Sequence, residues 1–254
     1  MAGQKLSLRR TLRRARERVL GRMFGTVVGA DVDVPWVALT FDDGPHPVTT
    51  PLVLDLLARH GANATFLMVG REARRLPELV ARVVAAGHAI GHHTLDHVSL
   101  PGLERSALRR QVLEGFAAVG PNCARLFRPP WGHGDLSASW VARRAGHEVI
   151  AWSGHAFDWQ RQEVPELTSR LQARLYPGAI VLLHDAPQEC DVPDVAPRTQ
   201  LLSALDKVLG SAADAWRFVT VPELLAAGRP RRRVRWRSPR APTLATRRRL
   251  HGGG

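Results

Sequence analysis

The stretch "LTFDDGP", residues 39–45, places two acidic side chains directly after a short apolar run. That run, residues 36–41, has the composition of a β-strand, and Gly44-Pro45 then turns the chain. Successive side chains of a strand point to opposite sides, so Asp42 and Asp43 would face different surroundings. An acidic turn after a strand is also common, and this stretch alone leaves that structural interpretation open beside a functional one.

Apolar runs alternate with helix-like segments from residue 36 to residue 228. The runs are 36–41, 64–69, 89–92, 125–128, 148–152, 179–183 and 217–221. The helix-like segments are 49–60, 76–86, 103–119, 136–145, 163–175 and 197–209, and glycine, a common helix stop, directly follows most of them. The order predicts an α/β fold with a parallel sheet, closed or nearly closed into a barrel one unit short of eight.

Charge divides the chain into a basic extension (1–30), a central domain (31–228) and an Arg-rich tail (229–254). The whole chain has a net charge of +13, whereas residues 23–228 hold 18 basic and 22 acidic residues. Residues 5–24 predict a basic amphipathic helix, which either lies on a membrane surface or packs on the barrel. The Arg-rich tail has little periodicity and is predicted to be disordered. An anionic membrane is the favoured partner of these ends, ahead of solvent and of nucleic acid.

The sequence predicts a cytoplasmic protein, peripheral to the inner membrane face if its basic ends bind lipid. Its two cysteines, Cys123 and Cys190, match no zinc spacing and no disulfide framework, which fits a reducing compartment. No apolar stretch is long enough to span a membrane, and the N-terminus lacks the apolar core of a signal peptide.

Polar clusters follow five of the predicted strands. Because chemistry in such folds lies at the carboxyl ends of the strands, these clusters are expected to share one site. They are Asp42-Asp43, "GHHTLDH" (91–97), "RPPWGHGD" (128–135), "WSGHAFDW" (152–159) and "LLHD" (182–185).

His93 and His97 are spaced as ligands of one metal ion. Four residues apart on a helical turn, they would lie on one face, and imidazole suits zinc. A catalytic zinc commonly takes three protein ligands, so one carboxylate of the Asp pair could bind the metal while the other activates a water. His88 and His92 are competing candidates, and His92 aligns poorly with His97.

The chain resembles the polysaccharide deacetylases of carbohydrate esterase family 4, the NodB-homology fold, over about residues 34–225. The resemblance rests on five motifs in the family's order: "TFDDGP", "HTLDH", "RPPWG", "SGHAFDW" and "LLH". It implies a distorted, incomplete (β/α) barrel and a NodB-homology catalytic domain over residues 31–228. It also implies a metal-dependent hydrolase that removes N-acetyl groups from an amino sugar or glycan, with lipid-linked and nucleotide-linked glycans among the candidate substrates.

By this resemblance, Asp43, His93 and His97 would hold a divalent metal, usually Zn²⁺. Asp42 would be the base that activates the attacking water, and Arg128 would orient Asp42 and keep it ionised.

The resemblance also implies the remaining roles. The backbone N–H of Trp131 would help to bind the oxyanion. His184 would protonate the departing amine, with Asp158 raising its pKa. Leu182 and Trp159 would wall the pocket for the acetyl methyl group.

Three positions depart from the family's usual pattern: His92 stands where Asn is common, His155 where Asp is common, and Trp131 where Tyr is common. None of them removes a catalytic group, so an active enzyme is expected. Two alternatives stay open. One is hydrolysis of a formamide, another small amide or an O-acetyl ester by the same machinery, and the other is an inactive barrel that binds a glycan.

Overall fold

The computed structural model describes residues 21, 25–133, 136–186 and 198–234. Their strands are β1 (Thr26–Asp31), β2 (Trp36–Asp42), β3 (Ala64–Met68), β4 (Ala89–His92), β5 (Cys123–Phe127), β6 (Glu148–Val149), β7 (Gly154–His155), β8 (Ala179–His184), β9 (Arg217–Phe218) and β10 (Arg229–Arg233). Their helices are α2 (Thr49–Arg59), α3 (Gly70–Arg75), α4 (Pro77–Ala85), α5 (Arg105–Val119), α6 (Leu136–Arg144), α7 (Val164–Gln172), α8 (Thr199–Ala212), α9 (Val221–Ala227) and the 3₁₀ turn η1 (Pro130–Gly132).

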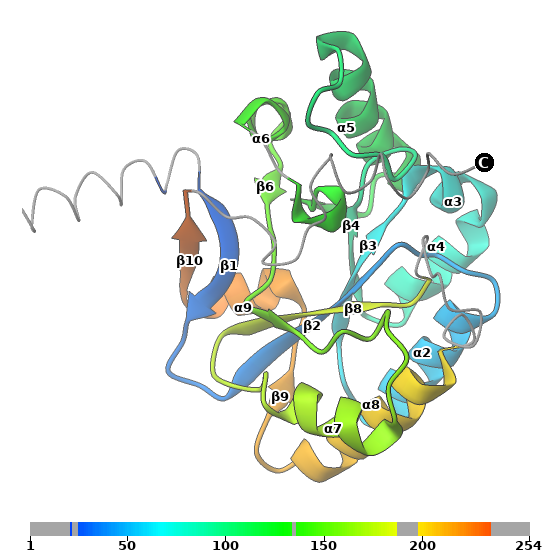
Figure 1. The fold of residues 1–254 in the computed structure, drawn as a ribbon, viewed down its shortest axis with the longest axis vertical. Helices are drawn as coiled ribbons and strands as arrows, with labels where there is room; N and C mark the ends of the chain where they lie inside the picture. Colours follow the sequence, from blue (N-terminus) through cyan, green and yellow to red (C-terminus); the bar gives the residue numbers. More distant parts are fainter. Residues whose placement is uncertain (1–20, 22–24, 134–135, 187–197, 235–254) are drawn as a thin grey trace, which may run out of the picture.

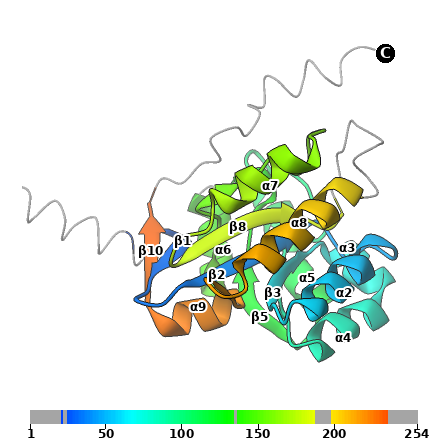
Figure 2. The ribbon, with the colours of Figure 1, turned by 90° about the horizontal axis from the view of Figure 1, so that it is seen from below.

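One curled sheet forms the centre of the molecule, with helices around its outside (Figures 1 and 2). Its strand order is β10-β1-β8-β2-β3-β4-β5-β6, with β7 paired to β8 and β9 to β2. The strands from β2 to β9 pair in parallel, whereas β1 pairs antiparallel with both β8 and β10. A single parallel bridge between Val27 and Ile150 links β1 to the segment after β6. The sheet is therefore an incomplete, distorted barrel.

Strand β2 shows how the fold directs residues to the site. Its alternate residues Val37, Leu39 and Phe41 pack in the core between the sheet and the helices α2, α7 and α8. The residues between them face the other way: Ala38 joins the core inside the curled sheet, and Thr40 and Asp42 share that face. The strand thus delivers one buried carboxylate to the inside of the barrel at its carboxyl end.

The seven strands and six helices predicted between residues 36 and 228 are all present, and their ends differ from the predicted ones. Gly61, Gly87, Gly120 and Gly146 follow their helices at positive φ, as helix stops do. Gly210 is the exception, because it lies inside α8 instead of ending that helix. The last apolar run is also divided, since Val221 begins α9 rather than continuing β9.

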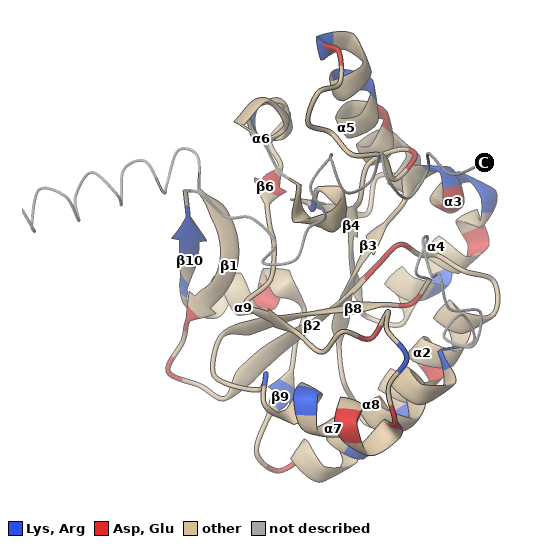
Figure 3. Ribbon diagram, in the orientation of Figure 1, with Lys and Arg blue, Asp and Glu red and all other residues tan. Residues whose placement is uncertain are grey.

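Two strands extend beyond the predicted boundaries of the central domain. Strand β1 contains residues of the predicted extension, and β10, whose arginines are blue in Figure 3, contains the first five residues of the predicted tail. The two strands pair over Thr26–Asp31 and Arg229–Arg233, so backbone hydrogen bonds order a segment whose composition predicted disorder. The predicted amphipathic helix and the rest of the tail lie outside the described residues. No helix within the described part of the chain is long and apolar enough to cross a membrane.

Candidate active site

Asp42 and Asp43 separate at the end of β2, and their surroundings differ. Both are buried, at 2% and 5% exposure. Asp42 is the last residue of the strand, whereas Asp43 has φ of 79°, which turns its side chain out of the strand's alternation. Asp42 faces Arg128, and Asp43 faces His93 and His97.

The Asp43 carboxylate lies between the two histidines. Its Oδ1 is 3.1 Å from His97 Nε2 and 3.5 Å from His93 Nε2. The three ligand atoms lie within 4.8 Å of one another. The prediction that His93 and His97 meet on a helical turn is wrong, because the segment after β4 is a bend in which Thr94 and His97 have positive φ. The bend nevertheless aims both imidazoles at one carboxylate.

The chemistry of this donor set fits a divalent metal. One carboxylate oxygen and two imidazole nitrogens are typical ligands, and three of them leave a coordination position open. The His93 Nδ1 lies 2.7 Å from the Arg128 carbonyl, which fixes the ring and leaves Nε2 facing Asp43. Burial lowers the pKa of His93 to about 4, so its ring is neutral at physiological pH, as a ligand must be. His88 and His92 do not belong to this cluster.

Arg128 anchors Asp42 from inside the barrel. Its guanidinium is fully buried and donates Nη1 to Asp42 Oδ1 at 2.5 Å and to the Thr40 hydroxyl at 2.8 Å. Nη2 donates to the Ala151 carbonyl at 2.8 Å, and the group lies over the Trp152 ring. Burial lowers the pKa of Arg128, and the Asp42 charge opposes that change. This pairing fixes the orientation of the Asp42 carboxylate.

His184 lies beside Asp42, because the two residues are paired across β8 and β2. Its Nδ1 is 3.2 Å from Asp158 Oδ1, and its backbone N–H donates to Asp158 Oδ2 at 2.9 Å. Burial lowers the pKa of His184, but the charge and hydrogen bond of Asp158, with the charges of Asp43 and Asp42, raise it to about 9. His184 is therefore a cation at neutral pH, with Nε2 available to donate a proton.

Arg198 is the residue of this site that sequence reasoning missed. It is buried, bonds the Asp158 carboxylate through Nη2, and donates to the Asp158 carbonyl at 2.8 Å and the His184 carbonyl at 3.0 Å. It thus holds both members of the His–Asp pair. Arg198 has φ of 59° and lies just before α8, and neither composition nor periodicity predicts a buried residue at such a position.

Two tryptophans of the motifs border the site. The Trp131 ring lies 4.4 Å from the His97 ring, and Trp159 meets the His184 ring edge at 5.2 Å. Leu182 is buried in the inner core against which Trp159 packs. Of the departures from the family pattern, His92 is buried and stacks on Phe127, away from the metal cluster.

Asp185 is a second group that the sequence analysis did not single out. Its carboxylate accepts a hydrogen bond from the Thr50 hydroxyl, while its other oxygen, Oδ1, has no partner among the described residues. Burial raises the pKa of Asp185 to about 7, and the Asp43 charge acts in the same direction.

Comparisons with known proteins agree with this geometry. Residues 29–150 match the family model described as polysaccharide deacetylase. A chitooligosaccharide deacetylase of Sinorhizobium fredii is 37% identical over 195 residues, which cover 74% of this chain and 91% of that protein. The chain belongs to the polysaccharide deacetylase family.

Other members of the polysaccharide deacetylase family match over similar lengths. A peptidoglycan-N-acetylglucosamine deacetylase of Bacillus cereus is 38% identical over 194 residues, which cover 74% of this chain and 87% of that protein. A solved structure of a peptidoglycan N-acetylglucosamine deacetylase, in complex with a naphthalenyl N-hydroxybenzamide, superposes with a TM-score of 0.71 at 27% identity. That match covers 80% of this chain and 94% of the solved chain.

Proposed function

We propose that this protein is a metal-dependent hydrolase that removes N-acetyl groups from an amino sugar, free or within a glycan. The observation that carries the proposal is the side-by-side placement of a buried, Arg128-paired Asp42 and an Asp158-paired His184 next to the Asp43, His93 and His97 cluster. The relatives named as chitooligosaccharide and peptidoglycan deacetylases support the substrate class.

Amide hydrolysis needs an attacking water, a stabilised oxyanion and a protonated leaving group. A divalent cation held by Asp43, His93 and His97 would supply a Lewis acid and make water more acidic. Asp42, held in place by Arg128, takes the proton of the attacking water. The N–H of Trp131 donates to the developing oxyanion.

The departing amine requires a proton, since an amide anion is a very poor leaving group. His184 is protonated at neutral pH and gives that proton to the sugar nitrogen. Asp158 holds the ring orientation and stabilises the cation, and Arg198 fixes Asp158 in turn. Leu182 and Trp159 border the space for the acetyl methyl group. We propose Zn²⁺ as the cation, because a His₂-carboxylate donor set suits it.

Two alternative functions use the same site. Another small amide or an O-acetyl ester could be cleaved by the same machinery, and the leaving group distinguishes them: an ester needs the His184 proton less than an amide does. An inactive glycan-binding barrel would retain substrate binding but release no acetate, and the closeness of Asp42, His184 and the Asp43, His93 and His97 cluster supports the active enzyme instead.

A peripheral membrane location through the basic ends is also part of the proposal. The net charge of +13 comes from those ends, which suits an anionic lipid surface. Flotation with vesicles of anionic and of neutral lipid tests it: we expect flotation with the anionic vesicles only, and none with either would contradict it.

The test of the function is acetate release from N-acetylated glycans supplied free, nucleotide-linked and lipid-linked. Zinc-loaded protein should release acetate, chelator-treated protein should not, and added zinc should restore release. His184→Gln should abolish amide cleavage, whereas His60→Gln, which alters a surface His60–Asp206 pair, should not. Release that survives complete metal removal would refute the proposed function.

A further inference from the structure

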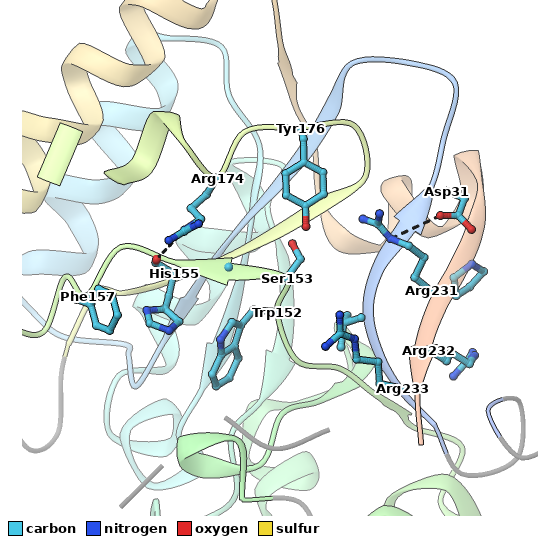
Figure 4. Close-up of a pocket in the computed structure, with 13 residues that line it drawn as sticks. Asp31, Trp152, Ser153, His155, Phe157, Arg174, Tyr176, Arg231, Arg232 and Arg233 are labelled. Atoms are coloured by element: carbon cyan, nitrogen blue, oxygen red, sulfur yellow. Dashed lines mark hydrogen bonds and ion pairs between the residues drawn. The ribbon is translucent and has the colours of Figure 1, made fainter. Parts of the chain in front are cut away.

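A cavity of about 720 Å³ lies beside the candidate active site, between β10 and the segment that contains β7 (Figure 4). Four arginines line it, against one acidic residue, Asp31. The arginines are Arg174, Arg231, Arg232 and Arg233. The lining is therefore cationic, although the central part of the chain carries more acidic than basic residues.

The arginines differ in how far their charge is already compensated. Arg232 is bonded through both Nη atoms to Glu148, at 2.7 and 2.5 Å. Arg231 lies 3.6 Å from Asp31 and donates to the Gly178 carbonyl at 3.0 Å. Arg174 donates only its Nε, to the His155 carbonyl, and no acid among the described residues pairs with Arg174 or with Arg233. At least two cationic groups at this cavity thus lack a counter-charge.

The backbone is shaped to hold two of these side chains. A Cβ at Gly154 would lie 2.6 Å from Arg174 Cδ, and a Cβ at Gly29 would lie 2.6 Å from Arg231 Nη2. A side chain at either position would require the neighbouring arginine to shift. On β10, Arg231 and Arg233 extend to one side of the strand and Arg232 to the other, where it pairs with Glu148, although part of Arg232 still lines the cavity (Figure 4).

Aromatic rings line the cavity as well as arginines. Tyr176 lies under the Arg231 guanidinium, with the ring centre 5.5 Å from Cζ, and its hydroxyl has no hydrogen-bond partner among the described residues. Trp152 and Tyr176 both line the cavity, from opposite sides in Figure 4. Flat apolar faces with convergent polar groups are the usual composition of a ligand pocket.

Two ring contacts link the lining of the cavity to the catalytic residues. His155, in its lining, meets the Trp159 ring at 5.1 Å, and Trp159 meets the His184 ring at 5.2 Å. Trp152, also in the lining, carries the Arg128 guanidinium over its ring. Trp159 and His155 thus stand between His184 and the arginines, and a glycan bound at both places would pass over these two rings.

We propose that this cavity is a substrate subsite for an anionic group, a phosphate or a carboxylate, carried by the glycan that the enzyme deacetylates. The inference rests on the proposed function. Guanidinium groups bind both anions through paired N–H donors, and the fork of Arg174 has its Nη atoms available for this geometry. A neutral sugar chain would offer no counter-charge to Arg174 and Arg233, which have no acidic partner within the described residues.

Calorimetric titration tests the subsite without requiring turnover. N-acetylglucosamine 1-phosphate is the phosphate probe, N-acetylmuramic acid the carboxylate probe and N-acetylglucosamine the neutral probe. The proteins are wild type, Arg174→Gln/Arg233→Gln and, as matched control, Arg109→Gln, an exposed arginine of α5. We expect the double substitution to weaken binding of one anionic probe roughly tenfold, because charged hydrogen bonds are lost. Added salt should weaken binding of that probe to the wild type, because salt screens the same charges.

The outcomes distinguish failure of the anion subsite from failure of the proposed deacetylase function. A loss for the phosphate probe alone identifies a phosphorylated substrate, and a loss for the carboxylate probe alone an acidic sugar. Equal binding of every probe by wild type and double variant would overturn the subsite, even if acetate release is normal. A protein that releases no acetate but still binds an anionic probe through Arg174 and Arg233 would refute the proposed function while the anion site stands.

Discussion

Replacing Asp158 by Asn should change the pH dependence of the reaction in a direction that the structure fixes. In the native site the pKa of His184 is raised to about 9, with burial opposing the Asp158 charge and hydrogen bond. Without that charge, burial remains, and the pKa falls to about 6.5 or lower, the ordinary value for histidine. A bound cation would offset the charges of Asp43, so Asp158 is the group that keeps the proton on His184.

The magnitude follows from the two pKa values. A fall from about 9 to about 6.5 corresponds to about 3 kcal/mol of lost stabilisation of the imidazolium. At pH 7.5 a group of pKa 6.5 is protonated in roughly one molecule in ten, so kcat should fall about tenfold from protonation alone. The loss should be small at pH 5.5 and should grow as the pH rises.

The assay is kcat for acetate release from pH 5 to 10, at equal metal content and well below the melting temperature. Asp206→Asn is the matched control, because it removes the acid of the surface His60–Asp206 pair and should leave the profile unchanged. An alkaline limb at the same pH in wild type and Asp158→Asn would refute the assignment of His184 as the acid controlled by Asp158.

Three further predictions concern single buried groups. Arg198→Met should lower the free energy of unfolding by about 3 kcal/mol in a denaturant titration, because the buried Asp158 carboxylate loses its arginine partner. An unchanged midpoint would contradict this. Asp185 is most stabilising when protonated, so the free energy of unfolding of metal-free protein should fall as the pH rises through the range between 3.8 and about 7. Asp185→Asn should remove about 3 kcal/mol of that change between pH 4.5 and 8, and an identical pH dependence would be evidence against a buried neutral carboxyl. His97→Ala should weaken metal binding at least about a hundredfold, measured by competition with a chelator. Unchanged affinity would show that His97 is not a ligand.

The sequence predicted the parallel part of the fold because each of its units carries its own signals. Apolar runs became the parallel strands, and glycines such as Gly61 and Gly146 adopted the positive φ that ends a helix. Strands β1 and β10 were missed because their order depends on each other: β10 is arginine-rich, and only pairing with β1 and the Arg232–Glu148 contact explain it as a strand.

The candidate site was predictable where residue type and motif agree, and not where distant contacts decide. Asp42, His93 and His184 stand in motifs at strand ends, and the structure brings them together. Arg198 gained its place from a left-handed backbone conformation and from contacts with residues 14 and 40 positions away. No local pattern encodes such contacts, and the same holds for the arginine-lined cavity, whose walls come from both ends of the described chain.

The central claim is that the neighbouring carboxylates divide the work, with Asp43 holding the metal and Asp42 acting as base. The most direct measurement is metal content together with the rate of acetate release in Asp42→Asn and Asp43→Asn. We predict that Asp42→Asn retains one metal per chain and loses activity at least about a hundredfold, whereas Asp43→Asn loses the metal itself. An Asp42→Asn protein that is active, or that fails to bind metal while Asp43→Asn binds it normally, would contradict the account.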